Sequence, residues 1–125
     1  MIFGIGTDII ETERIGRSIK KLGDRFLKKI FGENEITYCQ SKKNSIQHFA
    51  ARFAAKESFV KALGTGFDGT IGWNEICVVN DKNGKPSFEL FGRAAKKIKD
   101  GHIKSIYLTL SHIKGNAVAV AVFEK

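Results

Sequence analysis

The chain has 125 residues, 42% of them hydrophobic, which favours a single domain (residues 1–125) with a real core and is too short to expect two. Its 21 lysines and arginines exceed its 13 acidic residues, and the formal net charge of +8 predicts an anionic partner or substrate. The only long apolar run, Ala117 to Phe123, falls far short of the roughly 20 residues of a membrane span, so we expect a soluble, cytoplasmic protein with no membrane contact. Cys39 and Cys77 are too few for a disulfide framework and are expected to stay reduced.

The first predicted element is a strand from Ile2 to Asp8, which Gly4 and Gly6 interrupt. Glycines inside a strand indicate that another backbone approaches closely. Asp8 lies where the strand ends. Its carboxylate is therefore either exposed for binding or simply forms a turn or a helix cap.

Two amphipathic helices follow, Glu11 to Leu22 and Arg25 to Phe31, and a further helix is predicted from Glu35 to Ser41. The first helix carries Arg14, Arg17, Lys20 and Lys21 on one side. A basic helix face is usually a solvated surface, but the unbalanced net charge favours an acidic or phosphorylated partner here. Phe26 lies among the cations as a candidate apolar anchor for such a partner.

A long central helix is predicted from Ile46 to Gly64, with Ser45 as its cap and Gly64 as its left-handed end. At about 100° per residue its apolar stripe consists of Ile46, Phe49, Ala50, Phe53 and Val60. Glu57 falls inside this stripe, where an unpaired charge costs several kcal/mol. Lys61, one turn later, either forms a structural ion pair with Glu57 or has a function of its own.

The second half of the chain reads as hairpins that add antiparallel neighbours to the sheet, giving an α+β fold: an antiparallel sheet with a long central helix packed on it. A glycine-rich loop, Thr65 to Gly69, is only weak support for a phosphate site. The expected elements are strands from Trp73 to Asn80, Pro86 to Phe91, Ile106 to His112 and Ala117 to Glu124, and a basic helix from Arg93 to Lys99.

The histidines carry little information on their own. His112 ends a strand beside a turn, where a histidine either binds a substrate or is merely structural, and His48 and His102 stand alone. No Ser-His-Asp order, zinc-protease motif or P-loop is present, which excludes the common hydrolase, zinc-protease and NTPase classes.

Four motifs occur in a characteristic order: Gly4-Ile5-Gly6-Thr7-Asp8 with Arg14 after it, Arg52 to Gly66, Asn83-Gly84-Lys85-Pro86, and Leu110-Ser111-His112. Together they resemble the bacterial holo-[acyl-carrier-protein] synthases, which are short, single-domain phosphopantetheinyl transferases. The resemblance runs from Met1 to the final strand. It implies a phosphopantetheinyl transferase-like fold for the whole chain.

The resemblance also implies an activity. Phosphopantetheine would pass from coenzyme A to a serine of apo-acyl carrier protein, releasing adenosine 3',5'-bisphosphate, in support of fatty acid biosynthesis. Asp8 and Glu57 match the family's Mg²⁺ ligands, and hard carboxylate oxygens suit that ion. Lys61 matches a catalytic cation that stabilises charge on the leaving group or protonates it. Deprotonation of the serine falls to Glu57 or to a water in the magnesium site.

By the same resemblance, the adenosine and 3'-phosphate portion of coenzyme A would be held by Arg52, Asn83, Gly84, Lys85 and His112. The acidic carrier protein would dock on Arg14, Arg17, Lys21, Arg25 and Phe26. The family's short members work as trimers with active sites between subunits, so a homotrimer is implied.

Two other functions remain as alternatives. A basic nucleic-acid-binding module would use the same cationic helices but would have no need for Asp8 and Glu57, and no zinc-finger, helix-turn-helix or RNP-type pattern is present. We therefore expect no nucleic-acid partner. A non-catalytic domain that binds coenzyme A or carrier protein would keep the basic surface but lose metal dependence.

Overall fold

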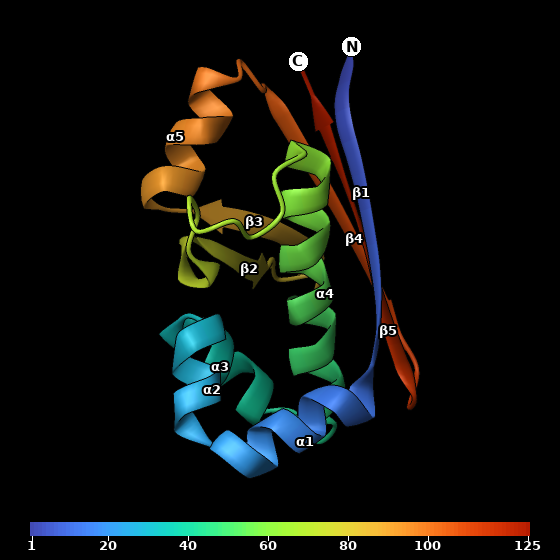
Figure 1. The fold of residues 1–125 in the computed structure, drawn as a ribbon. Coiled ribbons are helices and arrows are strands. Elements are labelled where there is room, and N and C mark those ends of the chain that lie inside the picture. Colours follow the sequence, from blue (N-terminus) through green and yellow to red (C-terminus); the bar gives the residue numbers. More distant parts are fainter.

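The computed structural model describes every residue from Met1 to Lys125 and confirms the α+β fold (Figure 1). Its elements are β1 (Ile2–Glu11), α1 (Thr12–Leu22), α2 (Asp24–Ile30), α3 (Glu33–Gln40), α4 (Ser45–Leu63), the 3-10 turn η1 (Trp73–Glu75), β2 (Ile76–Asn80), β3 (Pro86–Leu90), α5 (Gly92–Asp100), β4 (Ser105–His112) and β5 (Asn116–Glu124). The strand predicted from Trp73 begins at Ile76, because the three residues before it form the 3-10 turn.

The main sheet is antiparallel in the order β1-β5-β4. β5 lies in its centre and alternates strictly: Ala117, Ala119, Ala121 and Phe123 are buried, and the residues between them are partly exposed. The small alanines leave room for α4 to lie close against this face. One side of the central helix therefore packs on the main sheet.

The hairpin β2–β3 does not join this sheet, contrary to the prediction that it would add neighbours to it. It forms a two-stranded sheet on the other side of α4, beside α5 (Figure 1). The physical reason is that α4 is buried on more than one side, so a second layer must cover the flank that the main sheet leaves open. The turn itself is as predicted, with Gly84 at φ +85° and the Asp81 side chain accepting hydrogen bonds from two backbone amides.

Helix α4 has the predicted length and end but a wider buried surface. Gly64 adopts a left-handed conformation with φ 89°, and its amide donates to the carbonyl of Val60 at 3.0 Å. Asn44, and not the predicted Ser45, precedes the first turn, and neither caps it with a side chain. The predicted apolar stripe is narrower than the surface that α4 buries. Lys56 and Phe59, which lie outside the stripe, are fully buried, and Glu57 is partly buried.

Gly4 and Gly6 allow β1 to lie directly against α4, as the glycine pattern predicted. A Cβ atom on Gly6 would overlap the carbonyl of Ser58, and one on Gly4 would overlap the carbonyl of Ala62. Only glycine permits this approach of the two backbones. The consequence is that Asp8, two residues after Gly6, lies beside the middle of α4.

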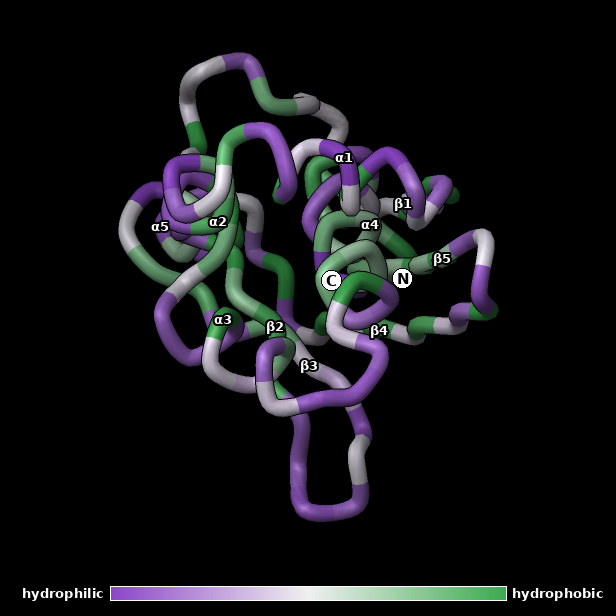
Figure 2. Tube along the Cα trace, turned by 90° about the horizontal axis from the view of Figure 1, so that it is seen from below, coloured by the Kyte–Doolittle hydropathy of each residue, from purple (hydrophilic) through white to green (hydrophobic).

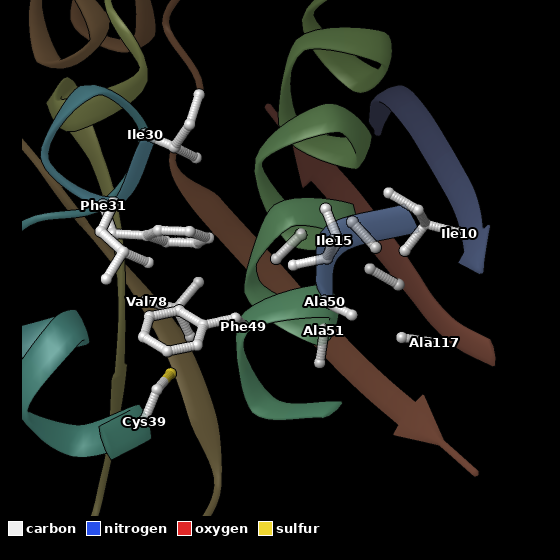
Figure 3. Packing of buried hydrophobic residues seen from close by; sticks show 14 residues of the cluster. Ile10, Ile15, Ile30, Phe31, Cys39, Phe49, Ala50, Ala51, Val78 and Ala117 are labelled. Carbon is white, nitrogen blue, oxygen red and sulfur yellow. The ribbon is translucent and has the colours of Figure 1, made fainter. Parts of the chain in front are cut away.

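Two apolar clusters fill the interior. In the larger one, the rings of Phe31 and Phe49 meet at 5.0 Å beside Cys39 and Val78, while Ile15 and Ala117 lie on the other side of α4 (Figure 3). The second cluster surrounds Phe59 at the opposite end of the helix. Figure 2 shows that hydrophobic stretches gather around α4 in the interior, whereas hydrophilic stretches occupy the outer helices and loops. No helix is both long and apolar enough to span a bilayer.

Candidate active site

Two carboxylates from different elements meet beside α4. Asp8 comes from β1 and Glu57 from the fourth turn of α4, and both are only partly exposed. Partial burial raises the pKa of Glu57, the charge of Asp8 raises it further, and Lys61 and Arg14 lower it. The two carboxylates are thus close enough to interact electrostatically. Two acids in one electrostatic environment are a site for a proton or a metal cation.

Lys61 completes this group, but its partner is not the one that helical spacing suggested. Its Nζ atom donates to Oδ1 of Asp8 and to the carbonyl oxygen of Thr7, each at 3.1 Å. The i,i+4 ion pair with Glu57 is absent, because the side chain reaches across to β1 instead. About half of the Lys61 side chain remains exposed, so its ammonium group is accessible to a bound anion.

Whether this site fits Mg²⁺ depends on the side chains that can act as its ligands. No group of three or more His, Cys, Asp or Glu side chains gathers anywhere in the chain. Mg²⁺ usually takes one or two protein carboxylates and completes its shell with substrate phosphate and water, so Asp8 and Glu57 suffice. The partial burial of Glu57 next to another acid also makes a cation favourable there.

A second group of predicted residues gathers at the start of α4. Arg52 is 2% exposed, hydrogen bonds with the side chain of Asn80, and stacks over the Tyr38 ring at 4.2 Å. Its Nε is buried and has no partner. Nδ1 of His112 lies 3.0 Å from the side-chain oxygen of Gln47. A small hollow of about 190 Å³ is lined by Arg52, Asn80, Tyr38, His112 and Gly84. Asn83 and Lys85 are exposed in the adjoining turn and do not line it.

The statement that His48 stands alone is wrong. Its ring lies 5.1 Å from that of His112 and 5.8 Å from that of Tyr38, edge-on in both cases. Burial lowers the pKa of His48, and the nearby charge of His112 lowers it further. No local pattern indicates this pair, since His48 and His112 are 64 positions apart and lie in different elements.

The two groups lie on opposite sides of α4. His48 and Glu57 are nine residues apart, which at about 100° per residue places them roughly 180° apart and about 14 Å apart along the axis. The fold therefore brings together Asp8, Glu57 and Lys61, and separately Arg52, Gly84 and His112. It does not bring the two sets together within one chain.

The expected docking residues form an exposed basic surface on α1 and α2. Arg14, Arg17, Lys21 and Arg25 are all exposed, and Arg17 pairs with Glu13 at 3.1 Å. Phe26 is half-buried and packs edge-on against Phe31 at 6.3 Å, so it is only partly available as an anchor.

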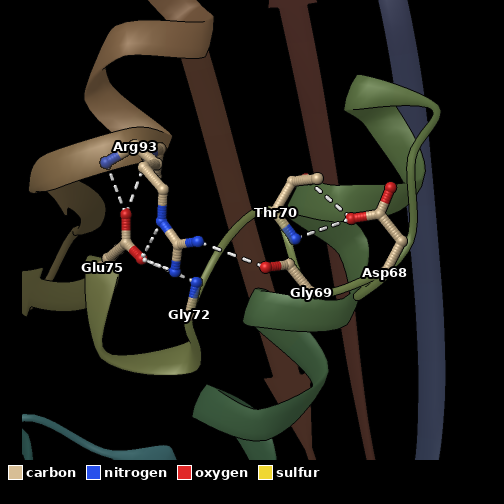
Figure 4. A network of polar contacts seen from close by, with 7 residues as sticks. Asp68, Gly69, Thr70, Gly72, Glu75 and Arg93 are labelled. Atoms are coloured by element: carbon tan, nitrogen blue, oxygen red, sulfur yellow. Dashed lines mark hydrogen bonds and ion pairs between the residues drawn. The ribbon is translucent and has the colours of Figure 1, made fainter.

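The loop after α4 is held by a polar network that sequence reasoning missed (Figure 4). Glu75 accepts hydrogen bonds from the amides of Gly72 and Ala94 and from the Arg93 side chain. Burial raises the pKa of Glu75, but these hydrogen bonds lower it by more, so the pKa lies below its ordinary value. Arg93 also donates to the carbonyl of Gly69 at 3.2 Å. The network fixes the loop against the first turn of α5.

Residues 4–121 match the family model of the 4'-phosphopantetheinyl transferase superfamily, and the chain belongs to this family. Among its relatives, the holo-[acyl-carrier-protein] synthase of Geotalea daltonii is 44% identical over 125 residues, all of both chains. That of Halothermothrix orenii is 45% identical over 100% of this chain and 99% of its own. The family resemblance seen in the sequence is confirmed.

Solved structures of holo-[acyl-carrier-protein] synthases have the same fold as this chain. The holo-[acyl-carrier-protein] synthase of Neisseria meningitidis superposes with a TM-score of 0.93 at 36% identity, covering all of both chains. That of Bacillus anthracis, in complex with CoA (3',5'-ADP), gives 0.81 at 37% identity over 100% and 98% of the chains. The Helicobacter pylori enzyme, in complex with coenzyme A, gives 0.83 at 31% identity over 96% and 99%.

Proposed function

We propose that this chain is a holo-[acyl-carrier-protein] synthase, which transfers the 4'-phosphopantetheine group from coenzyme A to a serine of apo-acyl carrier protein. The observation that carries this function is the meeting of Asp8, Glu57 and Lys61 beside α4 in a member of the transferase superfamily. Relatives of similar length that align end to end bear this name. The nucleic-acid-binding alternative has no support among them.

Asp8 and Glu57 would hold Mg²⁺. When bound, the ion would polarise the pyrophosphate of coenzyme A and neutralise charge on the leaving adenosine 3',5'-bisphosphate. The two carboxylates come from separate elements that Gly4 and Gly6 hold together, so the fold fixes their separation before any ligand arrives. Such preorganisation avoids reorganisation during the reaction.

Two residues have roles in moving protons and charge. Glu57 would accept the proton of the serine hydroxyl, and a water molecule held beside it is the alternative base. Lys61, half-exposed and oriented by Asp8, is placed to stabilise negative charge on the leaving phosphate or to protonate it. Its bonds to Asp8 and Thr7 hold the ammonium group in position.

The hollow lined by Arg52, Gly84 and His112 would hold the adenosine and 3'-phosphate portion of coenzyme A, with Asn83 and Lys85 in the adjoining turn. The unpartnered Nε of Arg52 supports this assignment, because a buried donor without an acceptor is costly. The exposed Arg14, Arg17, Lys21 and Arg25, with Phe26, would dock the acidic carrier protein.

The working form would be a homotrimer with shared active sites, in the cytoplasm. Since the two groups lie on opposite sides of α4, one coenzyme A needs the Arg52 group of one subunit and the Asp8 group of another. The outer face of β1 supports this assembly: Ile5 and Ile9 are 63% and 68% exposed, and their cross-strand neighbours Val122 and Val118 continue the apolar face. Such a patch on a monomer marks an interface.

The deciding experiment is intact-protein mass spectrometry of an apo-acyl carrier protein incubated with coenzyme A, with Mg²⁺ or with a chelator. We expect the mass of phosphopantetheine to be added only with the metal. A Ser→Ala carrier protein serves as the control for the acceptor. Absence of the added mass with active carrier protein would overturn the transferase function, and metal-independent addition would overturn the role of the carboxylates.

A further inference from the structure

Lys56, the residue immediately before Glu57, is a fully buried cation that the proposed reaction does not use. Its side chain is 0% exposed, and its Nζ donates to the carbonyl of Ile30 and to Oε1 of Glu35 at 2.7 Å, and to the carbonyl of Trp73 at 3.1 Å. An ammonium group has three N–H donors, so all of them are engaged. These contacts reach α2, α3 and η1 from a single point on α4.

Glu35 extends the contacts of Lys56 to two further segments. This carboxylate, 1% exposed, accepts the amide of Gly32 at 2.9 Å on Oε1 and the amide of Val78 at 3.0 Å on Oε2. It therefore joins the start of α3 to β2. We call Lys56 and Glu35, with the backbone groups that they bind, the Lys56 tether.

The most informative contact of the tether is with the end of α2. Ile30 is the last residue of that helix, where carbonyl groups lack helical partners and the helix dipole favours a cation. A second donor acts two residues earlier, because Nδ2 of Asn74 donates to the carbonyl of Lys28 at 2.9 Å. The C-terminal turn of α2 is thus held by side chains from α4 and η1.

A buried ion pair is a poor way to gain stability, since desolvation offsets most of its attraction. What the Lys56 tether supplies is a fixed geometry between α2 and the α4 turn that carries Glu57. Helix α2 carries Arg25, which is exposed, and Phe26, which is half-buried. Position matters for such a surface, because a displacement of about 1 Å can cost on the order of 10²-fold in rate.

We propose that Lys56 is a positioning residue: through the Lys56 tether it sets helix α2 relative to Glu57, so that the serine of a docked carrier protein meets the Asp8–Glu57 carboxylates. The inference rests on the proposed function, and in particular on docking at α2. It predicts a larger effect on the carrier protein than on coenzyme A, because the expected coenzyme A hollow shares α3 and β2 with the tether but contains no residue of α2.

Two variants test the tether, one at an exposed contact and one at its buried ion pair. Asn74→Ala removes the exposed tie to Lys28 and leaves the core intact, and Asn34→Ala, an exposed asparagine on α3, is its matched control. Lys56→Met combined with Glu35→Gln removes both buried charges without leaving either unpaired. We expect kcat/KM for the carrier protein to fall about threefold in the first and on the order of 10-fold or more in the double variant. KM for coenzyme A should stay within about twofold in Asn74→Ala, and in the double variant it should change less than kcat/KM for the carrier protein.

The readouts separate positioning from simple structural support. Thermal unfolding is recorded for each variant, and Asn74→Ala remains testable even if the double variant does not fold. Equal losses toward both substrates, or an unchanged kcat/KM for the carrier protein in folded variants, would overturn the inference. Arg25→Glu, with the tether intact, tests the docking surface by itself. If Arg25→Glu has no effect on the carrier protein, the docking assignment fails; if it does and the tether variants do not, only the inference fails.

Discussion

Lys61 on α4 reaches Asp8 at the far side of the β1–α4 contact, with Nζ 3.1 Å from Oδ1, and leaves Glu57 on its own helix without an ion pair. The contact raises the question of whether Lys61 stabilises the fold or acts in the reaction. An exposed pair of this kind contributes little to stability, because water screens it. Its value lies in orientation, since it fixes the ammonium group beside the carboxylates.

The first prediction concerns Lys61→Met. If the lysine stabilises charge on the leaving phosphate, kcat should fall on the order of 10²-fold, while KM for coenzyme A changes much less. The melting temperature should change little, because the pair with Asp8 is half-exposed. Steady-state kinetics beside thermal unfolding decides the matter: a lowered melting temperature with kcat within a few-fold of wild type would make Lys61 structural.

The second prediction concerns the carboxylates. Asp8→Ala and Glu57→Gln should abolish transfer and weaken Mg²⁺ binding while leaving the fold intact. Calorimetric titration with Mg²⁺ measures binding apart from activity, and circular dichroism checks the fold. Glu33→Gln, a change at an exposed glutamate of α3, is the control. A folded Glu57→Gln enzyme that modifies carrier protein at the wild-type rate would exclude Glu57 from the site.

A pH dependence follows from the raised pKa of Glu57. A carboxyl group that binds its proton more tightly when folded makes the protein less stable as pH rises through the interval that starts near the ordinary value of 4.5. Without divalent metal, stability should therefore fall in this interval by more in wild type than in Glu57→Gln. Urea unfolding at a series of pH values, with Mg²⁺ absent or present, measures the difference. Parallel curves for the two proteins would contradict the assignment.

Charge reversal on the basic surface should affect one substrate only. Lys21→Glu with Arg25→Glu should raise KM for the acidic carrier protein and leave KM for coenzyme A nearly unchanged. Wild-type activity should also fall with added salt, because exposed charges act through screened, long-range attraction. Arg14 is left in place, since its charge also acts on Glu57. A carrier-protein KM equal to that of wild type would locate docking elsewhere.

Shared active sites predict complementation. Glu57→Gln lacks one group of residues and His112→Ala lacks the other, so each alone should have little activity. After mixing under conditions that exchange subunits, activity should return, because some sites combine an intact His112 with an intact Glu57. Sedimentation of the mixture confirms the oligomeric state. Mixtures no more active than the average of their components would mean that each chain carries a complete site.

Local patterns in the sequence predicted most elements correctly. The end of α4 at Gly64 and the turn at Gly84 follow from backbone conformations that glycine adopts easily, and both need no knowledge of the rest of the chain. Gly6 even predicted the close backbone contact that places Asp8. The helix end and the turn depend on neighbours in sequence, which a pattern can represent, whereas Gly6 indicated a close contact without indicating that α4 makes it.

The failures concern contacts between distant residues. No local pattern singled out Lys56, because its partners Glu35 and the carbonyls of Ile30 and Trp73 come from three other elements. Lys61 satisfied helical spacing toward Glu57 and yet bonds to β1. A carboxylate or ammonium group has several possible partners at similar cost, and only the packed fold selects one.

The pairing of β1 with β5 has a consequence for how the site is made. Thr7 bonds to the carbonyl of Ala119, 112 positions later, and β1 has no other strand partner. Contacts so distant in sequence form slowly, because the long loop between them must close first. During synthesis, β1 therefore has no strand partner until β5 has left the ribosome. Asp8 is translated among the first residues, yet the sheet that holds it in place is one of the last parts of the molecule to assemble.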